Sequence, residues 1–413
     1  MNKRIAAIVI FLFACIQMNA LFAQQSELKF FYFKNADVAN AKGKMNAAED
    51  GELFDYKNKL ADAANYFLTQ GPWSVTFDKS PAASGDLHDY FSEGPYWWPV
   101  EDDPDAPYRR KDGQRNPDRF TNHKVSVTIM SQAVSTLSYA AYLLDNKEYA
   151  DKASEIIRVW FLDSLTKMNP NLNYAQSVRN KTEGRGVGLI EAGRFTRLLE
   201  AVNFLRESGF WNAEDHAGLR NWFTQFLLWM KTSPNGIDEK YRMNNHGSWY
   251  YAQTAAYSLF LKDYNSFQSA LQYIQDTLLV HQLDETGSFP EEEARTLSLH
   301  YSEFNLWALS TSASMGSLRG FDIWNHKTVS DVNLLAVFNK LIPFYLEPHN
   351  WKKEQIVPFD NSNLFSIAMV SYSLEDSRFY SVHKKLENIK RISLIKADLD
   401  PLFLVYCIIL SAK

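Results

Sequence analysis

The chain has 413 residues, of which 46% are hydrophobic and 15% aromatic, and its formal net charge is −5 at pH 7. This charge excludes the overall basic surface typical of nucleic-acid-binding proteins, so we expect no nucleic-acid partner. A polyanionic ligand would have to be bound by locally placed Arg and Lys. The only cysteines are Cys15 and Cys407, so removal or lipidation of the first leaves no internal disulfide, and a large core must supply the stability.

The first residues are predicted to form a secretory signal peptide. A basic start, Met1-Asn2-Lys3-Arg4, precedes an apolar run and then small residues, which predicts that residues 1–23 are removed by cleavage after Ala23. The apolar run is too short to span a membrane. Leu12-Phe13-Ala14-Cys15 also resembles a lipoprotein box, which would make Cys15 a lipid anchor. The first interpretation predicts a periplasmic or secreted protein, and the second an outer-membrane lipoprotein.

Residues 86–117 are predicted to form a long structureless loop. The segment contains five prolines and two glycines, which exclude a regular helix. Such loops in a compact fold are usually functional. Trp97 and Trp98 within it could fill the core, or they could line a carbohydrate cleft, because the C–H faces of sugars stack well on aromatic rings.

Helical spacing of apolar residues dominates after residue 124. Helices are predicted at 125–144, 148–165, 188–208, 213–231, 247–262, 264–281, 299–315, 330–346, 362–374 and 400–411. A run of about ten or more helices with short connections and almost no strand pattern predicts an all-α fold. No repeat of fixed length is visible, so we expect helical hairpins curved into an α/α toroid, as a single domain over residues 24–413.

Asn244-Asn245-His246-Gly247 lies at the predicted start of the helix 247–262. In a structural interpretation, an Asn side chain caps this helix by accepting a free backbone N–H. In a functional interpretation, the free N–H groups and partial positive charge of the helix N-terminus bind a carboxylate. Asn245 would then donate an amide hydrogen bond to the carboxylate, and His246 would donate similarly or take a proton.

A second candidate motif runs from Arg295 to Tyr301. On an ideal helix these two residues point in different directions, which favours an ordinary amphipathic helix. They can converge only if Arg295 lies in the loop before the helix and Tyr301 in its first turns. The turn Gly287-Ser288-Phe289-Pro290 just upstream allows that arrangement.

Other kinds of site lack their motifs. The histidines show no paired metal-ligand spacing, so we predict no catalytic metal. No nucleophile elbow, phosphate loop or dinucleotide fingerprint is present, so no cofactor is expected. Two alternatives stay open: an inverting glycoside hydrolase that uses Asp86 and Glu293, and a non-catalytic glycan-binding protein that uses Trp97 and Trp98.

These motifs together resemble the alginate lyase family over about residues 60–350. The residues that carry the resemblance are the loop from Gly94-Pro95-Tyr96-Trp97-Trp98-Pro99 to Arg115-Asn116-Pro117, then Gly188–Arg194, Asn244–Gly247 and Arg295–Tyr301. The resemblance implies an α/α toroid that cleaves uronate-containing polysaccharide by metal-independent β-elimination. It also implies that Asn245, His246 and Arg295 surround the uronate carboxylate, while Tyr301 moves protons. Trp97, Trp98, Arg115, Arg194 and Tyr250 are the candidate substrate-binding residues, and Tyr250 is the nearest alternative base.

The expected chemistry fits these residue types. Donors aimed at the uronate carboxylate stabilise the enolate-like charge that develops when the C5 proton leaves. Tyr301 acts as base and acid where the C5 proton and the C4 oxygen leave from one face, and His246 is the base where they leave from opposite faces. A tyrosinate needs a depressed pKa, which we expect the neighbouring cations to provide for Tyr301. The product carries a C4=C5 double bond.

Overall fold

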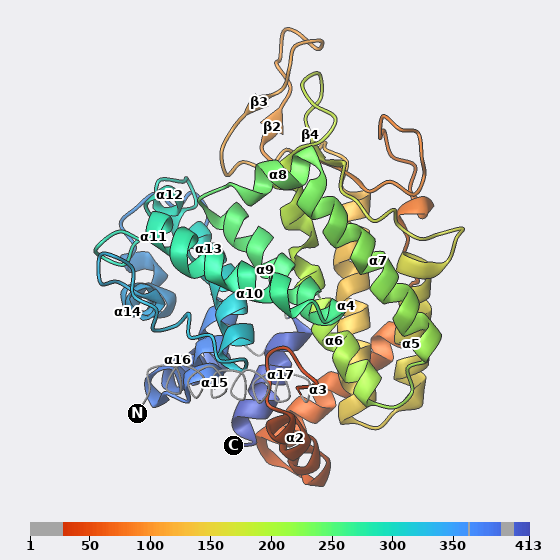
Figure 1. Ribbon diagram of the computed structural model, residues 1–413, viewed down its shortest axis with the longest axis vertical. Coiled ribbons are helices and arrows are strands. Elements are labelled where there is room, and N and C mark those ends of the chain that lie inside the picture. The colour runs from red at the N-terminus through yellow and green to blue at the C-terminus, as the bar shows by residue number, and fades with distance from the viewer. Residues whose placement is uncertain (1–27, 362–363, 390–399) are drawn as a thin grey trace, which may run out of the picture.

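The computed structural model describes residues 28–361, 364–389 and 400–413 (Figure 1). The predicted signal peptide, its cleavage site and Cys15 lie outside these residues, so the cellular location stays a prediction. Within the described ranges, no helix has the length and apolar character needed to cross a membrane.

Helices dominate the described chain, as the sequence predicted, and a helix occurs in each predicted segment. The corresponding helices are α4 (Asn122–Leu143), α5 (Lys147–Ile157), α6 (Phe195–Glu207), α7 (Ala213–Thr232), α9 (Asn245–Leu261), α10 (Tyr264–Tyr273), α11 (Leu279–Gln282), α13 (Ser298–Ser317), α14 (Leu334–Leu346), α15 (Phe365–Leu374) and α17 (Pro401–Ser411). Three tighter or wider turns extend them: the 3₁₀ helix η3 (Gly186–Arg194) and the π-helical turns η2 (Arg158–Leu162) and η4 (Ile274–Leu278).

Several further helices of the described chain were not predicted. They are α2 (Asn35–Ala47), α3 (Gly51–Leu68), α8 (Pro234–Lys240), α12 (Pro290–Glu293), α16 (Ser377–Ile389) and the short 3₁₀ turns η1 (Val75–Phe77) and η5 (Pro348–Asn350). In α2 the buried side chains are Val38, Ala41 and Met45, which is too sparse a stripe to stand out in the sequence. α8 and α12 are too short to display a helical period.

The long helices form an inner set covered by an outer set. α4 contacts α6, α6 contacts α9, α9 contacts α13, α13 contacts α15, α15 contacts α17, and α17 also contacts α4. Outside them, α5 packs on α4, α7 and α10 pack on α9, and α16 packs on α15. Helices α9 and α13 are buried around nearly their whole circumference, as an inner helix must be. This is the predicted α/α toroid.

The predicted structureless loop at residues 86–117 instead contains short strands. β1 (Phe91–Glu93) pairs in parallel with β4 (Tyr174–Ser177), and β2 (Trp97–Trp98) pairs antiparallel with β3 (Arg109–Arg110). The β2–β3 ribbon and the loop after β4 project from the same end of the molecule, beyond α8 (Figure 1). That end also carries the N-terminus of α9.

Candidate active site

A cavity of about 1170 Å³ lies between the β2–β3 ribbon, α8 and the N-terminal ends of α9 and α13. Its wall contains two carboxylates, Asp238 and Glu291, and nine cationic side chains. The nine are Arg110, Arg115, Arg119, Lys124, Lys181, Arg185, Arg194, Arg242 and Arg295. The chain as a whole is acidic, so this positive charge is concentrated locally, as binding of a polyanion requires.

The N-terminus of α9 forms one wall of the cavity. Asn244 is its cap: the side-chain oxygen accepts a hydrogen bond from the backbone N–H of His246 at 3.1 Å. Gly247 has no room for a side chain, because a Cβ there would lie 1.9 Å from the carbonyl oxygen of Arg242. Asn244 and Gly247 therefore have structural roles, as helix cap and as the residue that close packing requires. Asn245 and His246, between them, are the candidate functional residues of the motif.

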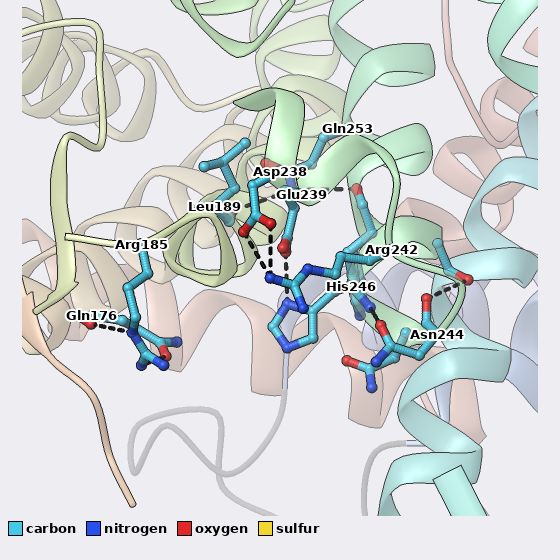
Figure 2. Close-up of polar contacts among 12 residues, drawn as sticks. Gln176, Arg185, Leu189, Asp238, Glu239, Arg242, Asn244, His246 and Gln253 are labelled. Atoms are coloured by element: carbon cyan, nitrogen blue, oxygen red, sulfur yellow. Dashed lines mark hydrogen bonds and ion pairs between the residues drawn. The ribbon is translucent and has the colours of Figure 1, made fainter. Parts of the chain in front are cut away.

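His246 lines the cavity and is held from behind by a buried carboxylate. Its Nδ1 lies 2.6 Å from Oε1 of Glu239 on α8, and Glu239 is fully buried. Because a carboxylate accepts, Nδ1 carries the hydrogen, and Nε2 is the nitrogen left to take or give a proton. Figure 2 shows the imidazole beneath Glu239, with its second nitrogen turned away from the carboxylate.

Asn245 is oriented differently from the sequence prediction. Its amide nitrogen donates to both oxygens of Glu292, at 2.8 and 2.7 Å, and its backbone N–H donates to the same carboxylate. The amide oxygen is the atom without a partner in the described structure. Donation to a substrate carboxylate would require the amide to turn over, which is favourable only if Glu292 is protonated. Burial is the largest influence on Glu292 and raises its pKa, which favours the protonated acid.

Arg295 and Tyr301 converge in the way that the sequence allowed. Arg295 lies in the turn before α13 and Tyr301 in the first turn of that helix, with the guanidinium carbon 3.8 Å from the centre of the phenol ring. The guanidinium also forms a two-point ion pair with Asp112 of the ribbon, at 3.0 and 2.7 Å. Arg295 therefore already has a carboxylate partner, supplied by the chain itself.

The surroundings of Tyr301 favour its protonated form. Burial raises its pKa well above the usual value, and Arg295 opposes this only in part. The expectation that neighbouring cations depress this pKa is therefore wrong, because loss of solvation outweighs their attraction. The Tyr301 hydroxyl also shares a hydrogen bond of 2.7 Å with the hydroxyl of Tyr96, a cavity residue of the 86–117 segment.

The opposite wall is built from β4 and η3. Gln176 has a left-handed backbone with φ of 49°, a strained conformation of the kind found at functional sites. Its carbonyl and side-chain oxygens accept hydrogen bonds from Arg185, at 2.8 and 3.2 Å (Figure 2). Gly188 is required here because a Cβ would lie 2.5 Å from Ala175 of β4. This close contact positions Arg194, which ends η3 and lines the cavity.

The ribbon contributes Trp97 and Arg110 to the cavity, but not Trp98, and Arg115 from the segment after the ribbon also lines it. The Trp97 ring is flanked by Lys181 at 4.5 Å and Arg185 at 5.3 Å. Trp98 instead donates from its indole nitrogen to the carbonyl oxygen of Gln114, within the ribbon. Neighbouring strand residues point to opposite faces, which explains why one tryptophan faces the cavity and the next does not.

Tyr250 does not line the cavity. It is 2% exposed, and its hydroxyl donates to the carbonyl oxygen of Met230 at 3.3 Å. Tyr250 lies one helical turn further along α9 than His246. At that depth its ring packs between α9 and α7 instead of reaching the cavity. Its predicted role in substrate binding is therefore corrected to core packing.

The carboxylates proposed for a glycoside hydrolase are not in the cavity wall either. Asp86 accepts hydrogen bonds from His88 and Asn169, and Glu293 is buried beside Lys353. The two side chains have separate surroundings, so they do not form the acid–base pair that an inverting hydrolase needs.

Some cavity residues were missed from the sequence. They are Tyr96, Arg119, Lys124, Lys181, Arg185, Asn244 and His300, together with Glu239 and Glu292 behind the wall. Tyr96 adjoins the two tryptophans and could have been included with them. Asn244 and His300 lie inside the two motifs already recognised, and the remaining residues carry no local signal, because the fold alone brings them to the site. In the described chain no group of three or more His, Cys, Asp or Glu residues is arranged to hold a metal ion.

Comparison with known proteins identifies the family. A family model described as alginate lyase matches residues 74–351. The fold matches the crystal structure of an alginate lyase from Bacteroides ovatus with a TM-score of 0.83 and 32% identity, covering 91% of this chain and 98% of that one. A search of curated proteins found no match.

More distant structures share the fold alone. Alginate lyase A1-III in complex with a tetrasaccharide matches with a TM-score of 0.58 and 15% identity, over 88% of this chain and 90% of that one. The structure of alginate lyase A1-III from Sphingomonas species A1 gives 0.52 and 16%, over 83% and 87%. The chain belongs to the alginate lyase family, and it is a polysaccharide lyase.

Glu239→Gln tests whether Glu239 orients His246. Glutamine can keep a hydrogen bond to Nδ1 but removes the charge that stabilises a protonated imidazole, so we expect turnover to fall by about 10-fold or more. The measurement is kcat from pH 5 to 9, with thermal unfolding as the check on folding. Glu285→Gln, at an exposed loop position, is the control and should behave as wild type. An unchanged kcat across this range would remove Glu239 from the site.

Trp97→Ala tests the ribbon as a binding surface. The ring lines the cavity, so its loss should raise KM by about 3- to 10-fold through lost stacking, with little change in the unfolding temperature. Trp98→Ala is the matched control, because it removes the same side chain from the next position, outside the cavity wall. Equal effects of the two substitutions on KM would show that Trp97 acts through the ribbon's stability.

Proposed function

We propose that this protein cleaves alginate by metal-independent β-elimination and leaves a 4,5-unsaturated uronate at the new chain end. The observation that carries the proposal is the convergence of Asn245, His246, Arg295 and Tyr301 on one strongly cationic cavity, in a chain of the alginate lyase family. The similar structures of alginate lyases support alginate as the substrate. The predicted export signal would place the enzyme in the periplasm or outside the cell.

The cationic wall suits the first part of the reaction. Removing the C5 proton of a uronate builds negative charge on its carboxylate, and preorganised donors lower the energy of that state. Arg115 lines the cavity and has no hydrogen-bond or ion-pair partner in the described structure. Asn244 also lines it, and its amide nitrogen is not used by the helix cap. After displacement of Asp112, Arg295 would join these two donors.

The proton transfers follow from the protonation of the free enzyme. Nε2 of His246 takes the C5 proton, the C5–H electron pair forms the C4=C5 bond, and the C4–O bond breaks. Tyr301 carries its proton in the free enzyme, so it gives that proton to the departing C4 oxygen. When the C5 proton and the C4 oxygen lie on the same face of the sugar ring, Tyr301 must act as the base and must therefore first lose its own proton. The hydroxyl of Tyr96, at 2.7 Å, can relay that proton away.

The reaction type is tested by incubating the protein with alginate and a panel of other acidic polysaccharides. We expect an absorbing unsaturated product from alginate and full activity in excess chelator, because the chain's own cations take the charge-stabilising role. A neutral polysaccharide is the control and should give no product. Saturated ends that incorporate solvent oxygen would identify a hydrolase, and loss of activity with chelator would refute metal independence.

Tyr301→Phe tests the proton donor. The change removes one oxygen and preserves the ring on which Arg295 stacks, so packing should persist while proton transfer stops. We expect a loss of at least about 10²-fold in kcat with substrate affinity roughly kept, the scale for deleting a general acid–base group. Tyr250→Phe is the matched control, since its phenol lies outside the cavity, and it should retain activity. Turnover retained by Tyr301→Phe would move the acid role to Tyr96.

A further inference from the structure

A smaller cavity of about 220 Å³ adjoins the active-site cavity. Arg194 and Trp307 line both spaces, so the two meet at these side chains. We call the smaller space the inner chamber. Its other wall residues include Ser131 and Ser135 of the inner helix α4 and Phe365 of α15, which places it within the inner set of helices.

The inner chamber has the polar groups of a carbohydrate site. The hydroxyl of Ser131 has no hydrogen-bond partner among the described residues, although the residue is more than nine-tenths buried, and Ser135 lies in the same wall. Arg194 uses Nε on the carbonyl oxygen of Glu191, and its two terminal nitrogens have no partner in the described chain. Buried polar groups left unpaired are costly, so this wall favours a ligand that brings hydroxyls and a negative charge.

The chamber also has an aromatic wall. The Trp307 and Phe365 rings stack at 4.8 Å with an interplanar angle of 4°. Arg197 lies 4.5 Å from the centre of the Trp307 ring and pairs with Asp400 at 2.7 Å. Aromatic rings, hydroxyls and a guanidinium together match the C–H face, the hydroxyls and the carboxylate of an acidic sugar.

The size of the chamber limits what can enter. Thr128 and Ser135, both in its wall, are seven residues apart on α4, which corresponds to about 10 Å along the helix. A chain entering past Arg194 meets the Arg197–Asp400 ion pair, which lies against Trp307. The volume of about 220 Å³ suits one sugar, and we take the ion pair as the inner limit of the site.

We propose that the inner chamber binds one carboxylated sugar at the end of the substrate chain, with its carboxylate on Arg194. This inference rests on the proposed lyase function and deepens it. Seating a chain end beside the reacting sugar makes the enzyme cut at a fixed distance from that end. Short products of uniform length should then appear from the start, while the long polymer persists.

The test fills the chamber without touching the active-site cavity. Ser135→Leu places a bulky apolar side chain in the chamber, and Ser135→Ala is the matched control that removes only the hydroxyl. With a short oligouronate, we expect Ser135→Leu to lower kcat/KM at least about 10-fold and Ser135→Ala less than about 3-fold. Ser131→Leu, one turn away, repeats the test if the first variant does not fold.

Product length gives the second measurement. Wild type acting on alginate should release short products while viscosity falls slowly, and the leucine variant should lose this pattern. Two results would overturn the chamber assignment but not the lyase function. One is a rapid loss of viscosity with a broad ladder of unsaturated products, and the other is a leucine variant with wild-type kinetics on the oligouronate. Absence of any unsaturated product from wild type would overturn the proposed function and this inference with it.

Discussion

The candidate active site depends on two buried carboxylates, from α8 and α12, that hold the first residues of α9. Glu239 fixes the imidazole of His246 from one side, and Glu292 fixes both the amide and the backbone of Asn245 from the other. A buried carboxylate is costly unless hydrogen bonds satisfy it, so each pair holds its side chains in one arrangement. The first turn of α9 is thereby rigid before a substrate arrives, and electrostatic catalysis requires this preorganisation.

The fold was predictable because its inner helices are long and densely apolar. The segment that became α4 displays helical spacing over many residues, and those that became α9 and α13 are long runs without proline, so few arrangements of the chain remained possible. The β2–β3 ribbon was not predictable, because each strand has two residues and its pairing is set by contacts with the β4 loop and with the turn before α13. Short elements of this kind take their structure from tertiary contacts.

The site was predictable only where its residues cluster in the sequence. Asn245 and His246 adjoin a helix start, and Arg295 and Tyr301 flank the start of another, so local patterns identified all four. Their partners come from elsewhere in the chain: Asp112 lies 183 residues before Arg295, and Tyr96 lies 205 residues before Tyr301. A pattern can indicate which residue types suit a reaction, but pKa values and hydrogen-bond directions follow from burial. Tyr301 and Asn245 were misjudged for this reason.

The ion pairs divide the cavity's cations into two groups with different roles. Arg242 and Arg295 each hold a carboxylate of the chain, Asp238 and Asp112, so their charge is largely neutralised before substrate binds. Arg115 and Arg194 have no carboxylate partner in the described chain, and they can receive a substrate carboxylate without breaking an ion pair. Attraction of the polyanion therefore falls mainly to the unpaired group. Arg295, stacked on Tyr301 and tied to the ribbon, serves first to position the phenol.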